Sequence, residues 1–247
     1  MKKIILLFAG ILPLCMFAQS TGEITYEDKV NMHRRLTGER ERFKEFVPEF
    51  RSTHKTLLFS EAAALYTTAK KQPEENVPEV GGRRSGHIRM MRSMGRNNEI
   101  LYTDLNEGTQ VSQRDFMDKK FLIDGTPKTY AWKITGKQMK FGEYVCMEAT
   151  YTDTAKTVKV WFTPQIPLST GPADFGGLPG TILAVDINEG ERTITAIEIN
   201  MRELEASEMT KPTKGKKVTE EEYRAIVKEK MKEIREQNGG GRRVFVH

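Results

Sequence analysis

The chain has 247 residues and a formal net charge of +5, with 39 lysines and arginines against 34 aspartates and glutamates. This length suits one domain with appendages. So small a positive charge does not favour a nucleic-acid partner, because that class of protein usually presents a strongly basic surface.

The first 18 residues predict a secretion signal. Lys2 and Lys3 form a positive start, residues 4–17 are apolar, and Phe17-Ala18-Gln19 suits cleavage after Ala18. The apolar stretch is shorter than the roughly 20 residues that a membrane-spanning helix needs. We therefore expect residues 1–18 to be a signal peptide that directs export, and we expect no membrane-spanning segment after it.

The next 70 or so residues mix strand, helix and loop patterns. Residues 22–30 alternate apolar and polar positions, which predicts an initial strand, and residues 36–50 have the spacing of a short amphipathic helix. Residues 53–59 and 62–68 predict a hairpin, although the alanines of the second segment leave a helix open. Residues 70–86 are rich in proline, glycine and charge, which predicts a loop.

From residue 99 onward, short strand patterns follow one another. They cover residues 100–102, 109–111, 120–123, 130–134, 144–152, 157–163, 182–187 and 193–200. Turn residues such as Gly136-Lys137 separate them, and this spacing favours an antiparallel sheet over βαβ units. We predict a mainly β domain over residues 19–203, with a curved antiparallel sheet or half-barrel, similar to periplasmic lipoprotein carriers by fold-level analogy alone. The pattern leaves open whether the sheet closes.

The C-terminal part, residues 204–247, has a different character. A basic linker over residues 211–217 precedes a capping box formed by Thr219 and Glu222, which predicts the start of a C-terminal α-helix. The apolar side chains of this helix share one face: Tyr223, Ile226, Val227, Met231 and Ile234. This narrow face packs on the sheet or on a partner, and a glycine-rich, flexible tail follows.

The most distinctive segment is Gly171-Pro172-Ala173-Asp174-Phe175-Gly176-Gly177-Leu178-Pro179-Gly180, between two predicted strands. Glycine permits backbone angles that other residues resist, and proline fixes its own φ. The segment is therefore a shaped connection. Two roles are open for it: it covers an edge or fills the concave face of the sheet with Phe175 and Leu178, or it forms a recognition surface on a rigid scaffold.

The residues Gly177 to Ile182 resemble the motif of the GLPGLI family, exported proteins of the Bacteroidetes, with Thr181 in place of a leucine. The approach to the motif, residues 160–168, and the segment 22–26 are also similar to that family. The resemblance implies export to the periplasm, a β-rich domain and frequent association with TonB-dependent outer-membrane transport. It implies no established activity. The motif residues are Trp161, Gly171, Pro172, Phe175, Gly176, Gly177, Leu178, Pro179 and Gly180.

One methionine- and histidine-rich segment suggests a metal site. The candidate ligands are His87, Met90, Met91 and Met94, with Met32-His33 offering two further donors. Thioether and imidazole groups together suit copper, especially Cu(I). The arginines at positions 89, 92 and 96 oppose a cation, so packing or an exposed loop remains an alternative. The basic residues between 83 and 96 also suit an anionic lipid, lipopolysaccharide or a peptide carboxylate.

No catalytic constellation emerges from the pattern. Cys146 is the one cysteine left after signal cleavage, and no Cys/His signature surrounds it, so we expect a small apolar residue on a buried strand face. Asp174 suits a structural role as acceptor of loop N–H groups. We expect a non-enzymatic periplasmic binding or accessory protein, with an outer-membrane transporter or an apolar ligand as partner and no cofactor. The alternative is a copper-handling protein.

Overall fold

The computed structural model describes residues 21–73 and 99–239. Twelve strands of this part form one sheet, in the order β12-β6-β5-β4-β3-β2-β1-β11-β10-β9-β8-β7. The strands are β1 (Gly22–Asn31), β2 (Phe50–Phe59), β3 (Ala63–Thr68), β4 (Glu99–Asp104), β5 (Thr109–Phe116), β6 (Lys119–Gly125), β7 (Lys133–Phe141), β8 (Tyr144–Thr152), β9 (Thr157–Thr163), β10 (Thr181–Ile187), β11 (Arg192–Met201) and β12 (Lys216–Val218).

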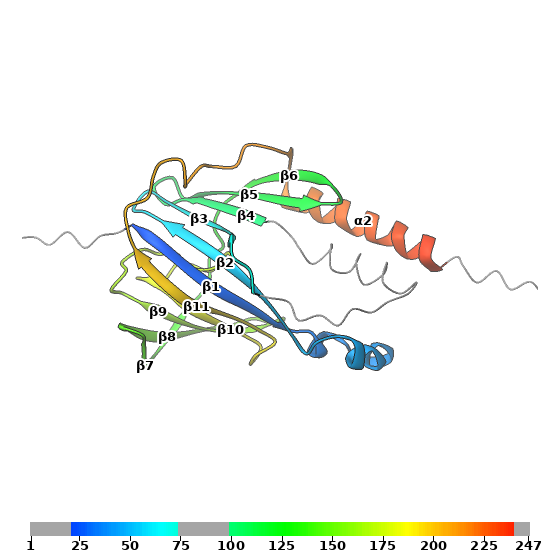
Figure 1. Ribbon diagram of the computed structural model, residues 1–247, viewed down its shortest axis with the longest axis horizontal. Helices are drawn as coiled ribbons and strands as arrows, with labels where there is room; N and C mark the ends of the chain where they lie inside the picture. The colour runs from blue at the N-terminus through cyan, green and yellow to red at the C-terminus, as the bar shows by residue number, and fades with distance from the viewer. Residues whose placement is uncertain (1–20, 74–98, 240–247) are drawn as a thin grey trace, which may run out of the picture.

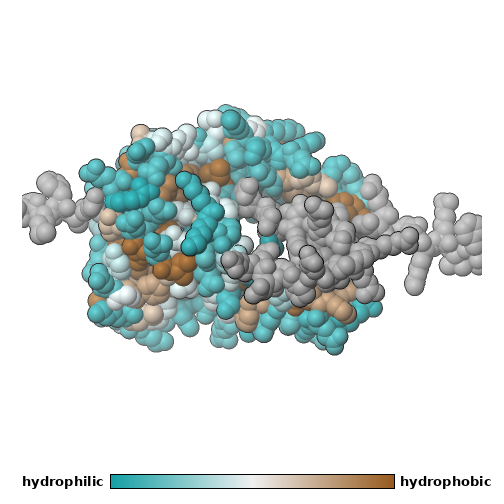
Figure 2. Space-filling view, viewed as in Figure 1, coloured by the Kyte–Doolittle hydropathy of each residue, from teal (hydrophilic) through white to brown (hydrophobic). Residues whose placement is uncertain are grey.

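The sheet is strongly curved and open (Figure 1). Neighbouring strands pair antiparallel, except that β12 runs parallel to β6. β7 and β12 are the two edge strands among the described residues. The predicted mainly β fold with a curved sheet and a C-terminal helix is therefore confirmed, and the sheet does not close. The face in view is mostly hydrophilic, with smaller apolar areas between the polar ones (Figure 2).

Several local predictions from the sequence need correction. The predicted strand over residues 130–134 begins only at Lys133, and Gly136-Lys137 lies within β7 instead of in a turn. The register of β7 on β8 jumps between Ile134 and Gln138, with Gly136 at a φ of 81°. An edge strand tolerates such an irregularity because its outer side has no ladder to maintain.

Other segments also differ from their predicted form. The segment 36–50 holds a 3-10 helix, η2 (Gly38–Phe46), after a single turn, η1 (His33–Arg35), where an amphipathic α-helix was expected. Residues 62–68, where a helix was left open, contain strand β3. The basic linker ends in β12, which adds a short parallel strand to the sheet.

The main core lies on the concave face, where side chains of β1 to β4 and of β8 to β11 meet the loops that cross it. Tyr26, Phe59 and Phe162 are fully buried there. The Tyr26 hydroxyl donates a 2.7 Å hydrogen bond to the Ile182 carbonyl, which ties β1 to β10 across the intervening β11. This core fixes the side of the sheet on which the loops pack.

The C-terminal helix α2 (Glu220–Gly239) packs on the other half of the sheet. Its predicted capping box is confirmed by two bonds, from the Thr219 N–H to Glu222 (2.9 Å) and from the Glu222 N–H to the Thr219 hydroxyl (3.1 Å). The Tyr223 ring meets the Phe121 ring at a centroid distance of 5.4 Å. Arg114 joins the sheet to the helix by ion pairs to Glu99 (2.7 Å) and Glu220 (2.9 Å).

The first turns of α2 thus dock on the chain's own sheet. Ile226 and Val227 complete this small cluster, whereas Met231 and Ile234 are half-buried further along the helix and lie outside it. Neither α2 nor any other helix of the described residues is both long and apolar enough to cross a membrane.

Replacing Tyr223 by alanine should lower the free energy of unfolding by about 2 kcal/mol, because the ring loses its burial on Phe121. Lys232→Ala, on the exposed side of the same helix, is the matched control and should change it by less than about 0.5 kcal/mol. Urea denaturation measures both. Equal effects of the two substitutions would show that α2 does not depend on this contact.

Candidate functional site

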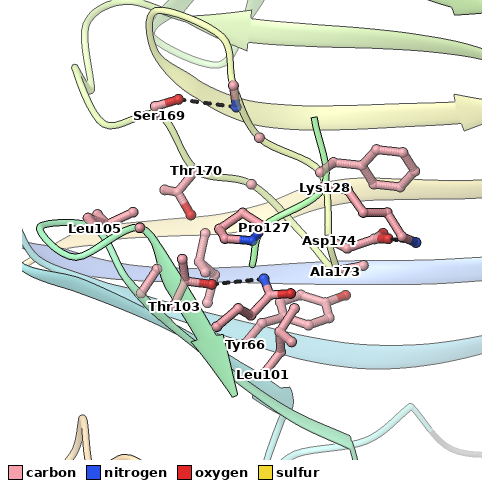
Figure 3. Close-up of a pocket in the computed structure, with 18 of the residues that line it drawn as sticks. Tyr66, Leu101, Thr103, Leu105, Pro127, Lys128, Ser169, Thr170, Ala173 and Asp174 are labelled. Carbon is pink, nitrogen blue, oxygen red and sulfur yellow. Dashed lines mark hydrogen bonds and ion pairs between the residues drawn. The ribbon is translucent and has the colours of Figure 1, made fainter. Parts of the chain in front are cut away.

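A cavity of about 320 Å³ opens on the concave face, at the lower end of the usual range for ligand sites, roughly 300–1,000 Å³. The sheet supplies its floor through apolar side chains, namely Leu57, Ala64, Tyr66 and Leu101. Two chain segments form the opposite wall: residues 127–130 and residues 169–177 (Figure 3). The glycine- and proline-rich segment that the sequence singles out therefore lines a cavity.

We call residues 169–180 the motif loop. Its end is anchored by Thr181, whose hydroxyl donates to the carbonyls of Ile166 (3.2 Å) and Leu168 (3.1 Å). Its middle is held by the Trp132 indole N–H, which donates to the Gly176 carbonyl at 2.8 Å. Thr181 is the first residue of β10 and Trp132 directly precedes β7, so both anchors tie the loop to the sheet and give it a defined shape.

Aromatic rings form part of the cavity wall and pack behind it. The Tyr130 ring stacks on Phe175 with centroids 5.3 Å apart, and Trp132 and Tyr151 lie 5.0 and 5.2 Å from Tyr130. Phe175 and Leu178 are both buried in the main core. Of the two roles left open for these two side chains, filling the concave face is the one that the structure shows.

The polar groups of the wall include one ion pair between its two segments. Lys128 pairs with Asp174, so the predicted loop acceptor has a lysine side chain as its partner (Figure 3). Burial, and then the Asp174 charge, raises the pKa of Tyr130. The buried hydroxyls of Tyr66 and Tyr130 have no hydrogen-bond partner of normal geometry among the described residues. Tyr130 is close enough to Asp174 for that carboxylate to raise its pKa, so the unsatisfied polar atom of the cavity residues is the Tyr66 hydroxyl in the floor.

Two glycines of the motif loop are required for different reasons. Gly180 has a φ of 150°, and a Cβ there would lie 2.2 Å from the Thr163 carbonyl oxygen. Gly177 has a φ of 83°, but the nearest atom to its added Cβ would be the Trp132 indole nitrogen at 3.9 Å. At position 180 any side chain would clash with the backbone. At position 177 a side chain has room, and only the left-handed backbone angle favours glycine.

The predicted motif residues divide between the cavity and the core. Gly171, Phe175, Gly176 and Gly177 line the cavity. The others lie elsewhere: Pro172, Leu178 and Gly180 are buried, Pro179 is exposed, and Trp161 is half-buried in β9.

Sequence reasoning missed the residues that face the motif loop across the cavity. Tyr66, Leu101 and Lys128 belong to segments that are ordinary strand or turn patterns in the sequence. Tyr130 was expected in a strand, and its place in the cavity wall carries no sequence signal that we recognise.

Residues 74–98 lie outside the part of the chain that the structure describes. They include the proposed copper ligands, His87, Met90, Met91 and Met94, and the arginines between 83 and 96. The copper site and the anion-binding basic patch therefore both stay predictions. His33 is described, and its Nε2 lies 2.7 Å from the Val47 carbonyl oxygen. Within residues 21–73 and 99–239, no group of three or more His, Cys, Asp or Glu side chains is arranged to hold a metal.

Cys146 lies in the main core and is fully buried, as the sequence predicted. Burial raises the pKa of its thiol to about 11. The neutral thiol is therefore favoured in the folded protein, which is the opposite of what a nucleophilic cysteine needs.

Comparison with known proteins adds little beyond the fold. A Bacteroidetes-associated family model, described as a protein of unknown function (Porph_ging), matches residues 152–184, a stretch that contains the whole motif loop and ends within β10. The matching model is not named for the GLPGLI family, so membership of that family stays a prediction. No curated protein matches the chain.

Two solved structures of PNGF-II, in space groups C2 and P21, have the same fold over most of this chain. Each aligns with a TM-score of 0.57 at 13% identity, covering 84% and 83% of this chain respectively. The chain spans about a third of the length of PNGF-II, 32% and 33% in the two structures. At this identity the likeness shows a shared fold and nothing about activity.

The two motif glycines should respond differently to substitution by alanine. Gly180→Ala should destabilise the protein by more than about 3 kcal/mol or prevent folding, because backbone atoms must move. Gly177→Ala should cost about 1 kcal/mol, the price of a left-handed backbone angle for an L-residue. Urea denaturation of both variants is the measurement, and a similar loss in the two would contradict the assigned backbone clash.

Cys146 should react slowly in the native state. A pKa of about 11 against an ordinary value of 9.0 makes the thiolate about a hundredfold rarer at pH 8, before any loss of access through burial. The rate of labelling by an aromatic disulfide reagent at pH 8 measures this. Labelling of the native protein in buffer should be at least a hundredfold slower than labelling of the protein unfolded in about 8 M urea. Comparable rates would show that the thiol is open to solvent.

Proposed function

We propose that the chain is a non-enzymatic binding or accessory protein of the cell envelope, which holds an apolar molecule or a partner segment and works beside a TonB-dependent outer-membrane transporter. The observation that carries the proposal is the cavity between the motif loop and the concave face of the sheet. Its apolar floor excludes water from one side of a ligand, and the polar atoms of its wall orient the other side.

The construction of the wall supports a role in binding. The motif loop is anchored by Thr181 and Trp132 and carries a buried aromatic ring, so little of its order has to be gained when a ligand arrives. A preformed site loses less conformational entropy on binding than a mobile loop does. The same construction explains why a segment with six glycines and prolines in ten residues is useful to a binding protein.

Export and the transporter partnership rest on the sequence. The signal-like start and the resemblance to exported Bacteroidetes proteins support them. The likeness to PNGF-II supports the fold alone, because the match covers only 32% of that chain at 13% identity. The proposal therefore takes no activity from it.

Filling the cavity should remove its occupant. We expect the protein, expressed with its own signal and purified from envelope fractions without detergent, to show a bound molecule by native mass spectrometry. Thr103→Trp places a large ring among the residues that line the cavity and should abolish this added mass. Thr109→Trp, at an exposed position on the neighbouring strand, should leave it unchanged.

Thermal unfolding of Thr103→Trp and Thr109→Trp, compared with the wild-type protein, shows whether each variant is folded. A bound molecule that persists in a folded Thr103→Trp protein would place the binding site elsewhere. Purification of the wild-type protein with no bound molecule and no envelope protein would contradict the proposed function.

A further inference from the structure

A polar cluster adjoins the cavity on the same face of the sheet. Lys55 lies two residues before Leu57 on β2, and residues two apart on a strand point to the same face about 7 Å apart. Thr68 is opposite Lys55 on β3, two residues after Tyr66. Lys55 and Thr68 are therefore the next row of side chains beyond the cavity floor. Tyr66 is opposite Leu57 in the floor row and directly precedes this row along the same face.

The carboxylates around this row already have cationic partners. Asp28 accepts two hydrogen bonds from Arg192, at 2.8 and 2.7 Å. Glu99 accepts one from Arg114 at 2.7 Å. These acids act on Lys55 through space, as does the Arg192 charge, but each is neutralised by an arginine. Arg114 is shared with Glu220, which also pairs with Arg224 at 3.0 Å. Lys55 is thus the one cation of this group that forms no ion pair with a carboxylate among the described residues.

Lys55 and Tyr66 have unused hydrogen-bonding capacity. The Lys55 ammonium has three N–H donors, and its single hydrogen bond within the described residues goes to the Thr68 hydroxyl at 2.9 Å. The Tyr66 hydroxyl is buried without a partner there. Burial lowers the pKa of Lys55, because the ammonium is only partly hydrated. A negatively charged acceptor between these two donors would compensate both costs.

We propose that the cavity binds an apolar carboxylic acid, with the ligand's hydrocarbon body over Leu57 and Leu101 and its carboxylate on the Lys55 ammonium and the Tyr66 hydroxyl. This inference rests on the proposed binding function and adds the ligand class to it. Hydrogen bonds between charged partners are about twice as strong as neutral ones. The head group therefore selects an acid over an alcohol of the same length.

Titration calorimetry with three six-carbon probes tests the ligand class: hexanoate, 1-hexanol and hexylamine. The wild-type protein should bind hexanoate about tenfold more tightly than 1-hexanol, the ratio expected from a charged hydrogen bond, and hexylamine most weakly. Lys55→Met keeps the aliphatic stem and removes the charge, so hexanoate affinity should fall about tenfold while 1-hexanol affinity is unchanged.

Three further variants separate the head-group contact from general effects. Lys55→Arg restores a cation and should recover the preference for hexanoate. Tyr66→Phe should weaken hexanoate several-fold and leave the melting temperature unchanged or raised, since it removes a buried hydroxyl that has no partner. Lys71→Met, at an exposed lysine just beyond β3, should have no effect on binding.

Equal affinity for hexanoate and 1-hexanol, or a preference that survives in Lys55→Met, would overturn the inference and leave the proposed binding function intact. Absence of binding by all three probes would also overturn it. The binding function itself is decided separately, by the bound molecule that Thr103→Trp is expected to remove.

Discussion

One close backbone approach organises the region around the cavity. Gly180 passes the Thr163 carbonyl so tightly that no side chain fits between them. This approach brings the end of the motif loop against the end of β9, at the start of β10. The Thr181 hydroxyl then binds two carbonyls of the preceding segment, and the chain between doubles back over the concave face. The loop can take this path only because position 180 lacks a Cβ. Gly171 makes a second close approach, since an added Cβ there would lie 2.9 Å from the Phe175 carbonyl oxygen.

The positions of Phe175 and Leu178 follow from this path. Both side chains enter the main core, so the outer part of the motif loop is held in place from below. Tyr130 stacks on Phe175, which brings the 127–130 segment to the same wall. A structural role and a binding role for the motif loop are therefore compatible: its apolar side chains build the core, and its backbone and Asp174 border the cavity.

The concave face is divided into an apolar half under the loops and a charged half near α2. Charges that are partly removed from water must be paired, and here Arg192 pairs with Asp28 while Arg114 pairs with both Glu99 and Glu220. Arg114 also connects the helix to the sheet. The cavity lies at the border of the two halves, so a ligand there meets apolar surface and charge together. Such a border suits an amphiphile better than a purely apolar molecule.

The sequence by itself determined the elements that depend on near neighbours. Alternating residues identified most strands, Thr219 and Glu222 marked the start of α2, and glycine with proline marked the motif loop as shaped. Only the tertiary structure decided which strands are neighbours and which side chains meet, because alternation reports a face of the sheet but not the partner across it. Tyr26 reaches the Ile182 carbonyl across 156 residues, and Lys128 reaches Asp174 across 46. The edge irregularity of β7 and the pairing of β12 were likewise decided by tertiary contacts. The cavity exists only where these distant segments converge, so no local pattern in the chain indicated Tyr66, Leu101 or Lys55.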